Sequence, residues 1–223
     1  MQSQTAVVIG ATGLIGSKAV ETLLRDTAFD KVRILVRKAF PVTNTKLEVQ
    51  FVDFNNTDDL SQKIGKGDAI FCCVGTTQKK VKGDLNAYRK VDYDIPVNTA
   101  RIALTNGFKK YLLISSVGAT AKSSNFYLKL KGEVEEEISA MPFESIHIFQ
   151  PSMLLGQRKE FRFGELIGKV LIQPLSFLLA GSLRKYKPIQ ASEVAKAMVA
   201  AAKKESRGIN VYTYDAIKAL ARS

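Results

Sequence analysis

The sequence predicts an α/β fold in which a doubly wound parallel sheet carries helices on both faces and a small lobe follows near the C-terminus. Short β-rich runs alternate with longer helical patterns, which is typical of βαβ units. The strand runs are nearly continuous in apolar residues, as expected for strands that helices cover on both faces. A glycine-rich turn also joins the first strand to the first helix.

The expected elements follow one another along the chain. We expect strands at residues 5–9, 32–36, 47–52, 69–74, 110–115 and 145–149. We expect helices at residues 14–25, 85–106, 126–140 and 193–204, the second of which stops at Gly107, a C-terminal signal. The alternation loses its regularity after Pro151. We therefore interpret residues 1–223 as a single domain, in which the residues after about 151 form a small substrate-side lobe.

The composition is that of a globular protein with a sizeable core: 223 residues, of which 46% are hydrophobic and 24% charged. The first residues show no secretory signal pattern, and no apolar run reaches membrane-spanning length, so we expect a cytoplasmic protein. Cys72 and Cys73 are adjacent, point to opposite faces of a strand, and are expected to be packing residues. With His147 as the one histidine and no spaced cysteine pair, we expect no metal site.

The formal charge is +12, and it is concentrated late in the chain. Residues 1–156 carry 20 basic against 16 acidic residues (+4), whereas residues 157–223 carry 13 against 5 (+8). Such charge can attract nucleic acid or anionic lipid. No nucleic-acid-binding motif accompanies it, so solubility and an anionic cofactor are the simpler interpretation. An alternative is that the apolar segment 166–183, followed by Arg184, Lys185 and Lys187, associates with a membrane surface.

The turn V-V-I-G-A-T-G-L-I-G-S places Gly10, Gly13 and Gly16 directly between the first strand and the first helix. In a Rossmann-type sheet the first glycine permits the tight turn, the second lets the backbone approach a pyrophosphate, and the third lets the helix pack close to the strand. The N-terminus of the helix then offers free N–H groups to the phosphates. The predicted cofactor-binding residues of this turn are Gly10, Ala11, Thr12, Gly13, Leu14, Ile15 and Gly16.

The residues after the second strand favour NADP(H) over NAD(H). NAD-preferring folds usually carry an acidic residue there for the ribose hydroxyls, whereas this chain has Arg37 and Lys38. Two cations suit a 2′-phosphate, although they can also be ordinary surface charges. Asp53 and Phe54, after the third strand, are also predicted to bind the cofactor. Asp53 is predicted to accept a hydrogen bond from the adenine amino group; the alternative is a loop or capping aspartate.

Ligands of such sheets bind beyond the carboxyl ends of the strands. The segment after the fourth strand is therefore predicted to lie against the cofactor's ribose, and the segment after the sixth to lie near the nicotinamide. The residues concerned are Val74, Gly75, Thr76, Thr77, Pro151 and Ser152.

The candidate catalytic residues are Ser115, Ser116, Tyr127 and Lys131, of which Tyr127 and Lys131 are also predicted to bind the cofactor. The two serines end the fifth strand, and the tyrosine and the lysine are four residues apart on a predicted helix, hence on one face. A tyrosine hydroxyl can give a proton to a carbonyl oxygen as hydride arrives, a neighbouring lysine cation favours the phenolate, and a serine hydroxyl can hold the carbonyl oxygen. The Y-x-x-x-K spacing alone is common by chance, and Lys131 can also be a plain surface lysine.

Two further features favour structural roles. His147 lies in a predicted buried strand and is interpreted as a core or edge residue rather than a catalytic one. The acidic run formed by Glu133, Glu135, Glu136 and Glu137 is interpreted as a solvated helix face.

These motifs resemble the atypical short-chain dehydrogenase/reductases, and within them the Tat-interacting-protein-like oxidoreductases. The matching segments are GATGLIGS at 10–17, FCCVGTT at 71–77, LISSVGA at 113–119, SSNFYLKLKGEVE at 123–135 and FQPSMLLG at 149–156. The resemblance implies a Rossmann fold that binds NADP(H), with Ser115 or Ser116, Tyr127 and Lys131 in the catalytic positions. It also implies that Arg37 is the family's arginine after the second strand.

Two functions follow as hypotheses. The first is an NADP(H)-dependent oxidoreductase acting on a small carbonyl or alcohol that the sequence does not identify. The alternative is a catalytically weak NADP(H)-binding regulator or redox sensor, because some members of the family are described as regulators. The sequence leaves open whether the chain is a monomer or a homodimer.

Overall fold

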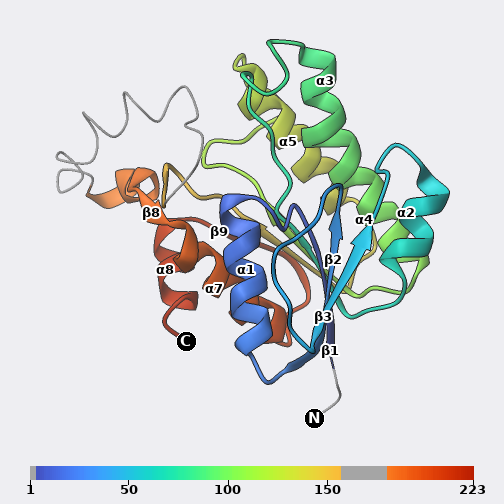
Figure 1. Ribbon diagram of the computed structural model, residues 1–223. Coiled ribbons are helices and arrows are strands. Elements are labelled where there is room, and N and C mark those ends of the chain that lie inside the picture. Colours follow the sequence, from blue (N-terminus) through green and yellow to red (C-terminus); the bar gives the residue numbers. More distant parts are fainter. Residues whose placement is uncertain (1–3, 157–179) are drawn as a thin grey trace.

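The computed structural model describes residues 4–156 and 180–223, and it contains a seven-stranded sheet in which every pair of neighbouring strands is parallel (Figure 1). The order across the sheet is β3-β2-β1-β4-β5-β6-β9. The strands are β1 (Gln4–Ile9), β2 (Phe29–Val36), β3 (Leu47–Phe51), β4 (Ala69–Cys72), β5 (Lys110–Ile114), β6 (Ser145–Phe149) and β9 (Gly208–Tyr212). The predicted doubly wound sheet is confirmed.

Helices cover both faces of the sheet (Figure 1). One face carries α1 (Leu14–Arg25), α7 (Ala191–Lys203) and α8 (Tyr214–Leu220); the other carries α2 (Thr57–Ile64), α4 (Ile95–Thr105) and α5 (Phe126–Ser139). Because side chains alternate along a strand, Ala6 and Val8 of β1 join the first core cluster, whereas Val7 and Ile9 join the second. This double burial explains why the strand runs are continuously apolar.

Three parts of the fold differ from the sequence-based expectation. Helix α2 was not predicted, because it is short and polar and buries only Leu60 and Ile64. The expected helix 85–106 is divided into α3 (Leu85–Arg89), a π-helical turn (Lys90–Asp94) and α4. Strand β9 was also not predicted, since it is a short edge strand whose Ile209 and Val211 are both exposed.

The region after residue 151 contributes to the main sheet as well as to smaller elements. β9 pairs with β6, and α7 packs against α1. A separate two-stranded sheet joins β7 (Leu154–Leu155) to β8 (Ile189–Gln190), and a 3-10 helix (Gly181–Tyr186) lies between β7 and β8 in the chain. Residues 157–179 lie outside the described residues, and they include most of the segment 166–183 to which the membrane-surface alternative refers. That alternative and the substrate-side lobe both stay predictions. No helix within residues 4–156 and 180–223 is both long and apolar enough to cross a membrane.

The cysteines and the histidine are core residues, as predicted. Cys72 belongs to one core cluster, whereas Cys73 packs against the other, and both thiols are free. His147 is fully buried, and its ring nitrogens lie 2.9 Å from the hydroxyls of Ser145 and Tyr212. Burial, assisted by the nearby lysines Lys110 and Lys204, lowers the pKa of His147 to about 4, so the ring is neutral at pH 7.

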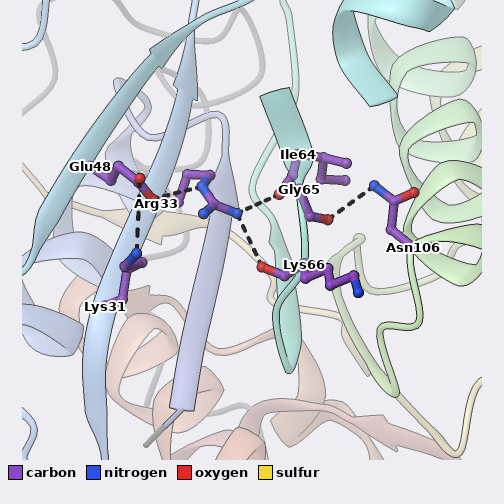
Figure 2. A network of polar contacts seen from close by, with 7 residues as sticks. All are labelled: Lys31, Arg33, Glu48, Ile64, Gly65, Lys66 and Asn106. Carbon is purple, nitrogen blue, oxygen red and sulfur yellow. Dashed lines mark hydrogen bonds and ion pairs between the residues drawn. The ribbon is translucent and has the colours of Figure 1, made fainter. Parts of the chain in front are cut away.

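Arg33 ties β2 to the end of α2 (Figure 2). Its Nε donates to Glu48 at 2.8 Å, and its Nη1 donates to the carbonyl oxygens of Ile64 and Lys66 at 2.7 and 3.1 Å. Asn106 donates from the other side to the carbonyl oxygen of Gly65 at 3.0 Å. Two polar side chains therefore donate to the carbonyls of Ile64 and of the two residues that follow α2.

Replacing Arg33 with Met is expected to lower the free energy of unfolding by about 2 kcal/mol, because a charged hydrogen bond to the part-buried carbonyl of Ile64 is lost together with an exposed one to Lys66. Urea unfolding measures the change. Lys31→Met is the matched control, since Lys31 reaches the same Glu48 only at 4.0 Å and is half exposed; it should cost less than about 1 kcal/mol. Equal losses for the two variants would show that Arg33 is an ordinary surface charge.

Candidate functional site

A cleft opens at the carboxyl ends of the central strands. β1 lies between β2 and β4, so the chain reverses its direction across the sheet here, and this is the switch point at which parallel sheets bind ligands. The cleft is lined by Gly13, Leu14, Ile15, Cys73, Val74, Gly75, Ile114, Ser115, Ser116, Tyr127, Lys131, Pro151, Ser152 and Leu154. The structure therefore brings together predicted residues from five separate segments of the chain.

The glycine turn packs against the end of β4. Gly10 has a φ of +77°, and a Cβ there would lie 2.5 Å from the backbone carbon and oxygen of Cys73. A Cβ on Gly16 would lie 2.2 Å from the carbonyl oxygen of Gly10, so the first turn of α1 lies directly on the strand end. Both glycines therefore meet a steric need that the sequence pattern predicts.

The first turn of α1 is suited to an anion. Asn56 caps α2 and Asn125 caps α5 through side-chain hydrogen bonds, but Gly13 at the start of α1 supplies no side-chain cap. Within the described residues no side-chain cap forms at Gly13, and Gly13, Leu14 and Ile15 line the cleft, so the positive end of the helix dipole borders it. These features fit the pyrophosphate of a dinucleotide.

The candidate catalytic residues line one wall of the same cleft. Ser115 and Ser116 follow β5 directly, whereas Tyr127 lies in the first turn of α5 and Lys131 one turn further on. Asn125 fixes the start of α5, because its Oδ1 accepts from the backbone N–H of Leu128 at 3.1 Å. The predicted convergence of the serines with the Y-x-x-x-K pair is thus present in the structure.

Lys131 is a buried cation rather than a surface lysine. Its Nζ lies 3.2 Å from Oδ1 of Asp92, and the two side chains are 4% and 0% exposed. The other carboxylate oxygen of Asp92 accepts from the backbone N–H of Thr76 at 2.7 Å. Asp92 therefore connects α5 to the loop after β4, which borders the cleft at Gly75.

The interpretation of the acidic run as a solvated face is wrong for Glu135. Its carboxylate is half-buried and accepts from the hydroxyl of Ser115 and from Nε2 of Gln150, which lies 3.0 and 2.9 Å from its two oxygens. Burial raises the pKa of Glu135, although these hydrogen bonds and Lys131 oppose that rise. The neighbours behave differently: Glu133 pairs with Arg89, and Glu137 pairs with Arg101, at the surface.

Several predicted cofactor residues lie outside the cleft lining. Ala11 and Thr76 are buried beneath the turn and the loop, and Phe54 and Thr77 are half-buried. Thr12 lines a second, mostly apolar cleft between α1 and the segment after β2 that contains Phe40 and Val42.

The predicted contacts to the adenosine half of the cofactor stay predictions. Arg37 and Lys38 are exposed at the end of β2. The Oδ1 of Asp53 accepts from the backbone and side-chain nitrogens of Asn55 at 2.9 and 3.0 Å, which is the loop role held open as the alternative for this residue.

Sequence reasoning missed Asp92, Glu135 and Gln150. A signal existed for Glu135, because it follows Lys131 by four residues and so continues the face that carries Tyr127 and Lys131. Asp92 gave no such signal, since the π-helical turn shifts the faces of the helix around it.

Comparison with known proteins identifies the family. A model of NAD(P)H-binding proteins matches residues 10–145. The chain is 32% identical to protein HTATIP2 of Rattus norvegicus over 172 residues, covering 76% of this chain and 70% of the relative. It is 32% identical to the mitochondrial protein FMP52 of Candida albicans over 209 residues, covering 91% and 88%.

Solved structures match the fold at low identity. A UDP-N-acetylglucosamine 4-epimerase from Methanobrevibacter ruminantium superposes with a TM-score of 0.70 at 17% identity, over 96% of this chain and 77% of the other. The Bordetella bronchiseptica enzyme WbmH, solved with NAD+, gives 0.72 at 16% identity, over 95% and 76%. The fold, the glycine turn and the family match agree, and the chain therefore belongs to the NAD(P)H-binding, atypical short-chain dehydrogenase/reductase-like family that includes HTATIP2 and FMP52.

Proposed function

We propose that this protein is an NADP(H)-dependent oxidoreductase that acts on a small carbonyl or alcohol substrate. The observation that carries the proposal is the single cleft in which Tyr127, Lys131 and the serine pair face the uncapped start of α1. When bound, the nicotinamide would supply or accept a hydride. The residues of the chain would then transfer the proton to or from the substrate oxygen and stabilise the charge that develops on it.

Each residue has a distinct task in this proposal. Tyr127 exchanges a proton with the substrate oxygen, because it lines the cleft and a phenol hydroxyl can both donate and accept a proton. Lys131, one helical turn further along the same cleft wall, supplies a buried ammonium, and Asp92 holds that ammonium in position. One serine hydroxyl donates a hydrogen bond to the substrate oxygen, and the apolar Ile114 and Leu154 help to exclude water.

Turnover tests the proposal directly. Purified protein should oxidise NADPH, followed at 340 nm, in the presence of at least one member of a panel of ketones, aldehydes and quinones. Tight NADPH binding without turnover across the panel would instead favour the NADP(H)-binding regulator or sensor.

We also propose a cytoplasmic location for this chain. The FMP52 relatives are named mitochondrial.

We infer the preference for NADP(H) from Arg37 and Lys38, two exposed cations that follow β2, the strand paired with β1, which leads into the glycine turn. An arginine can form two charge-assisted hydrogen bonds with a phosphate, whereas the ribose hydroxyl of NAD(H) offers no such partner. No acidic residue follows β2 directly, where an NAD-specific site would need one.

Replacing Arg37 with Ala is expected to raise the Kd for NADPH about 10–100-fold and to leave the Kd for NADH nearly unchanged, because only the phosphate contact is lost. Fluorescence titration of the reduced cofactors measures both. Lys109→Ala removes the same charge beside the opposite end of β5 and should alter neither Kd. A parallel loss for NADPH and NADH in Arg37→Ala would argue against a 2′-phosphate site.

A further inference from the structure

The Ser115 hydroxyl is already engaged inside the cleft wall. Ser115 is 4% exposed, and its Oγ donates to Oε1 of Glu135. Gln150 donates its amide group to both oxygens of the same carboxylate, at 3.0 and 2.9 Å. Glu135 is thus held between two donors, an arrangement that suits its ionised, acceptor-only form.

A serine hydroxyl has one proton to donate and two lone pairs with which to accept. Because the Ser115 proton is engaged in the hydrogen bond to Glu135, Ser115 can offer the cleft only its lone pairs. Ser116 differs: it lines the same cleft, is partly exposed, and has no side-chain hydrogen bond to any residue in the described part of the chain. Its own proton therefore remains available for an acceptor in the cleft.

We infer that Glu135 is a positioning residue that fixes Ser115 as a hydrogen-bond acceptor, and that Ser116 supplies the O–H that holds the carbonyl oxygen of the substrate. This inference rests on the proposed oxidoreductase function and makes its serine assignment specific. It also implies that the substrate, or the bound nicotinamide amide, presents an N–H or O–H donor to Ser115.

The pKa of Glu135 depends on the groups around it, so its titration can test whether Ser115 donates to it. Burial is the largest influence and raises the pKa of Glu135, and Glu136 adds to the rise. Ser115, Gln150 and Lys131 lower it, and Lys131 is itself paired with Asp92. When the carboxyl becomes protonated at low pH, it no longer requires the Ser115 proton, and Ser115 can turn to donate into the cleft.

The first experiment needs no substrate. Carbon-13 NMR of glutamate side-chain carboxyls follows the titration of Glu135 in the full chain, with E135Q used to assign its signal. Because the Ser115 hydrogen bond lowers the pKa of Glu135, S115A should move the midpoint of that titration upward, whereas S116A should leave it in place. An unchanged midpoint in S115A would overturn the inference whatever the catalytic activity.

The second experiment uses an ortho-quinone, 9,10-phenanthrenequinone, as the carbonyl probe with NADPH. S116A should raise the KM for the quinone about tenfold, the value of one hydrogen bond. The double variant S116A/E135Q should recover much of that loss, because the side-chain amide that E135Q introduces can donate to Ser115 and so free its proton. The triple variant S115A/S116A/E135Q should recover nothing.

The two experiments separate the two proposals. If Glu135 has a merely structural role, adding E135Q to S116A should raise the KM for the quinone further. This outcome would refute the inference. Recovery of S116A at low pH, in parallel with protonation of Glu135, would support it. If the wild-type protein reduces neither the quinone nor any other carbonyl of the panel, the oxidoreductase proposal fails, while the NMR titration still decides whether Glu135 holds Ser115.

Discussion

Replacing Tyr127 with Phe is expected to lower the turnover number by about 10²–10⁴-fold, the usual contribution of a positioned general acid or base. The variant loses one hydroxyl group from the cleft wall and keeps the aromatic ring, so the first turn of α5 and its Asn125 cap should be preserved. In the proposed function NADPH is held by the glycine turn and Arg37 rather than by this hydroxyl, so its Kd should change by less than about threefold.

Steady-state kinetics on any carbonyl that the wild-type protein reduces, together with NADPH titration, measures the two effects. Tyr93→Phe is the matched control, because Tyr93 lies outside the cleft and its ring contacts Arg89 through the face that Phe retains. Turnover in Tyr127→Phe within tenfold of the wild-type value would remove Tyr127 from the mechanism. A normal reaction would then have to take its proton from another group of the cleft.

The architecture was predictable because each central strand is buried on both faces. Runs such as residues 5–9 and 145–149 carry apolar residues at most positions, and this pattern is characteristic of strands that helices cover from both sides. The glycine turn was predictable for a related reason. Gly10 and Gly16 meet backbone atoms at distances that exclude any side chain, so the sequence must carry glycine there.

The polar interior of the site was not predictable to the same degree. Glu135 stands in a run of four glutamates within five residues, three of which face the surface or pair with surface arginines, so the run as a whole has the composition of a solvated face. The burial of one member depends on Ser115 and Gln150, which come from two different strand ends. Only the packing of α5 against the sheet brings these three groups together.

The burial of Asp92 was also not predictable, because the local helix geometry around it is irregular. A regular α-helix from residue 85 to residue 106 would place each side chain by the 3.6-residue period, whereas the π-helical turn Lys90–Asp94 changes that phase in the middle. The carboxylate can be buried because Lys131 forms an ion pair with one oxygen and the N–H of Thr76 donates to the other, and both partners are distant in sequence. A buried ion pair of this kind follows from tertiary structure, not from periodicity.

Replacing Gly10 with Ala is expected to lower the free energy of unfolding by about 3 kcal/mol and to raise the Kd for NADPH at least about tenfold. Two causes act together: a left-handed backbone costs an alanine about 1–2 kcal/mol, and overpacking costs about 1–3 kcal/mol more. The added methyl group would meet the backbone of Cys73 at 2.5 Å, where no flexible side chain can move aside. Displacing this turn would also displace the start of α1.

Gly83→Ala separates these two causes. Gly83 has a φ of +81°, almost the value at Gly10, but no atom lies within 4 Å of the position that its Cβ would take. This variant should therefore show the backbone cost alone, about 1–2 kcal/mol by urea unfolding, with an unchanged Kd for NADPH. If the two variants lose equal stability and bind NADPH equally well, the close approach between the glycine turn and β4 is not what the cofactor site requires. If only Gly10→Ala loses NADPH, the contact between the turn and the strand end is what shapes that site.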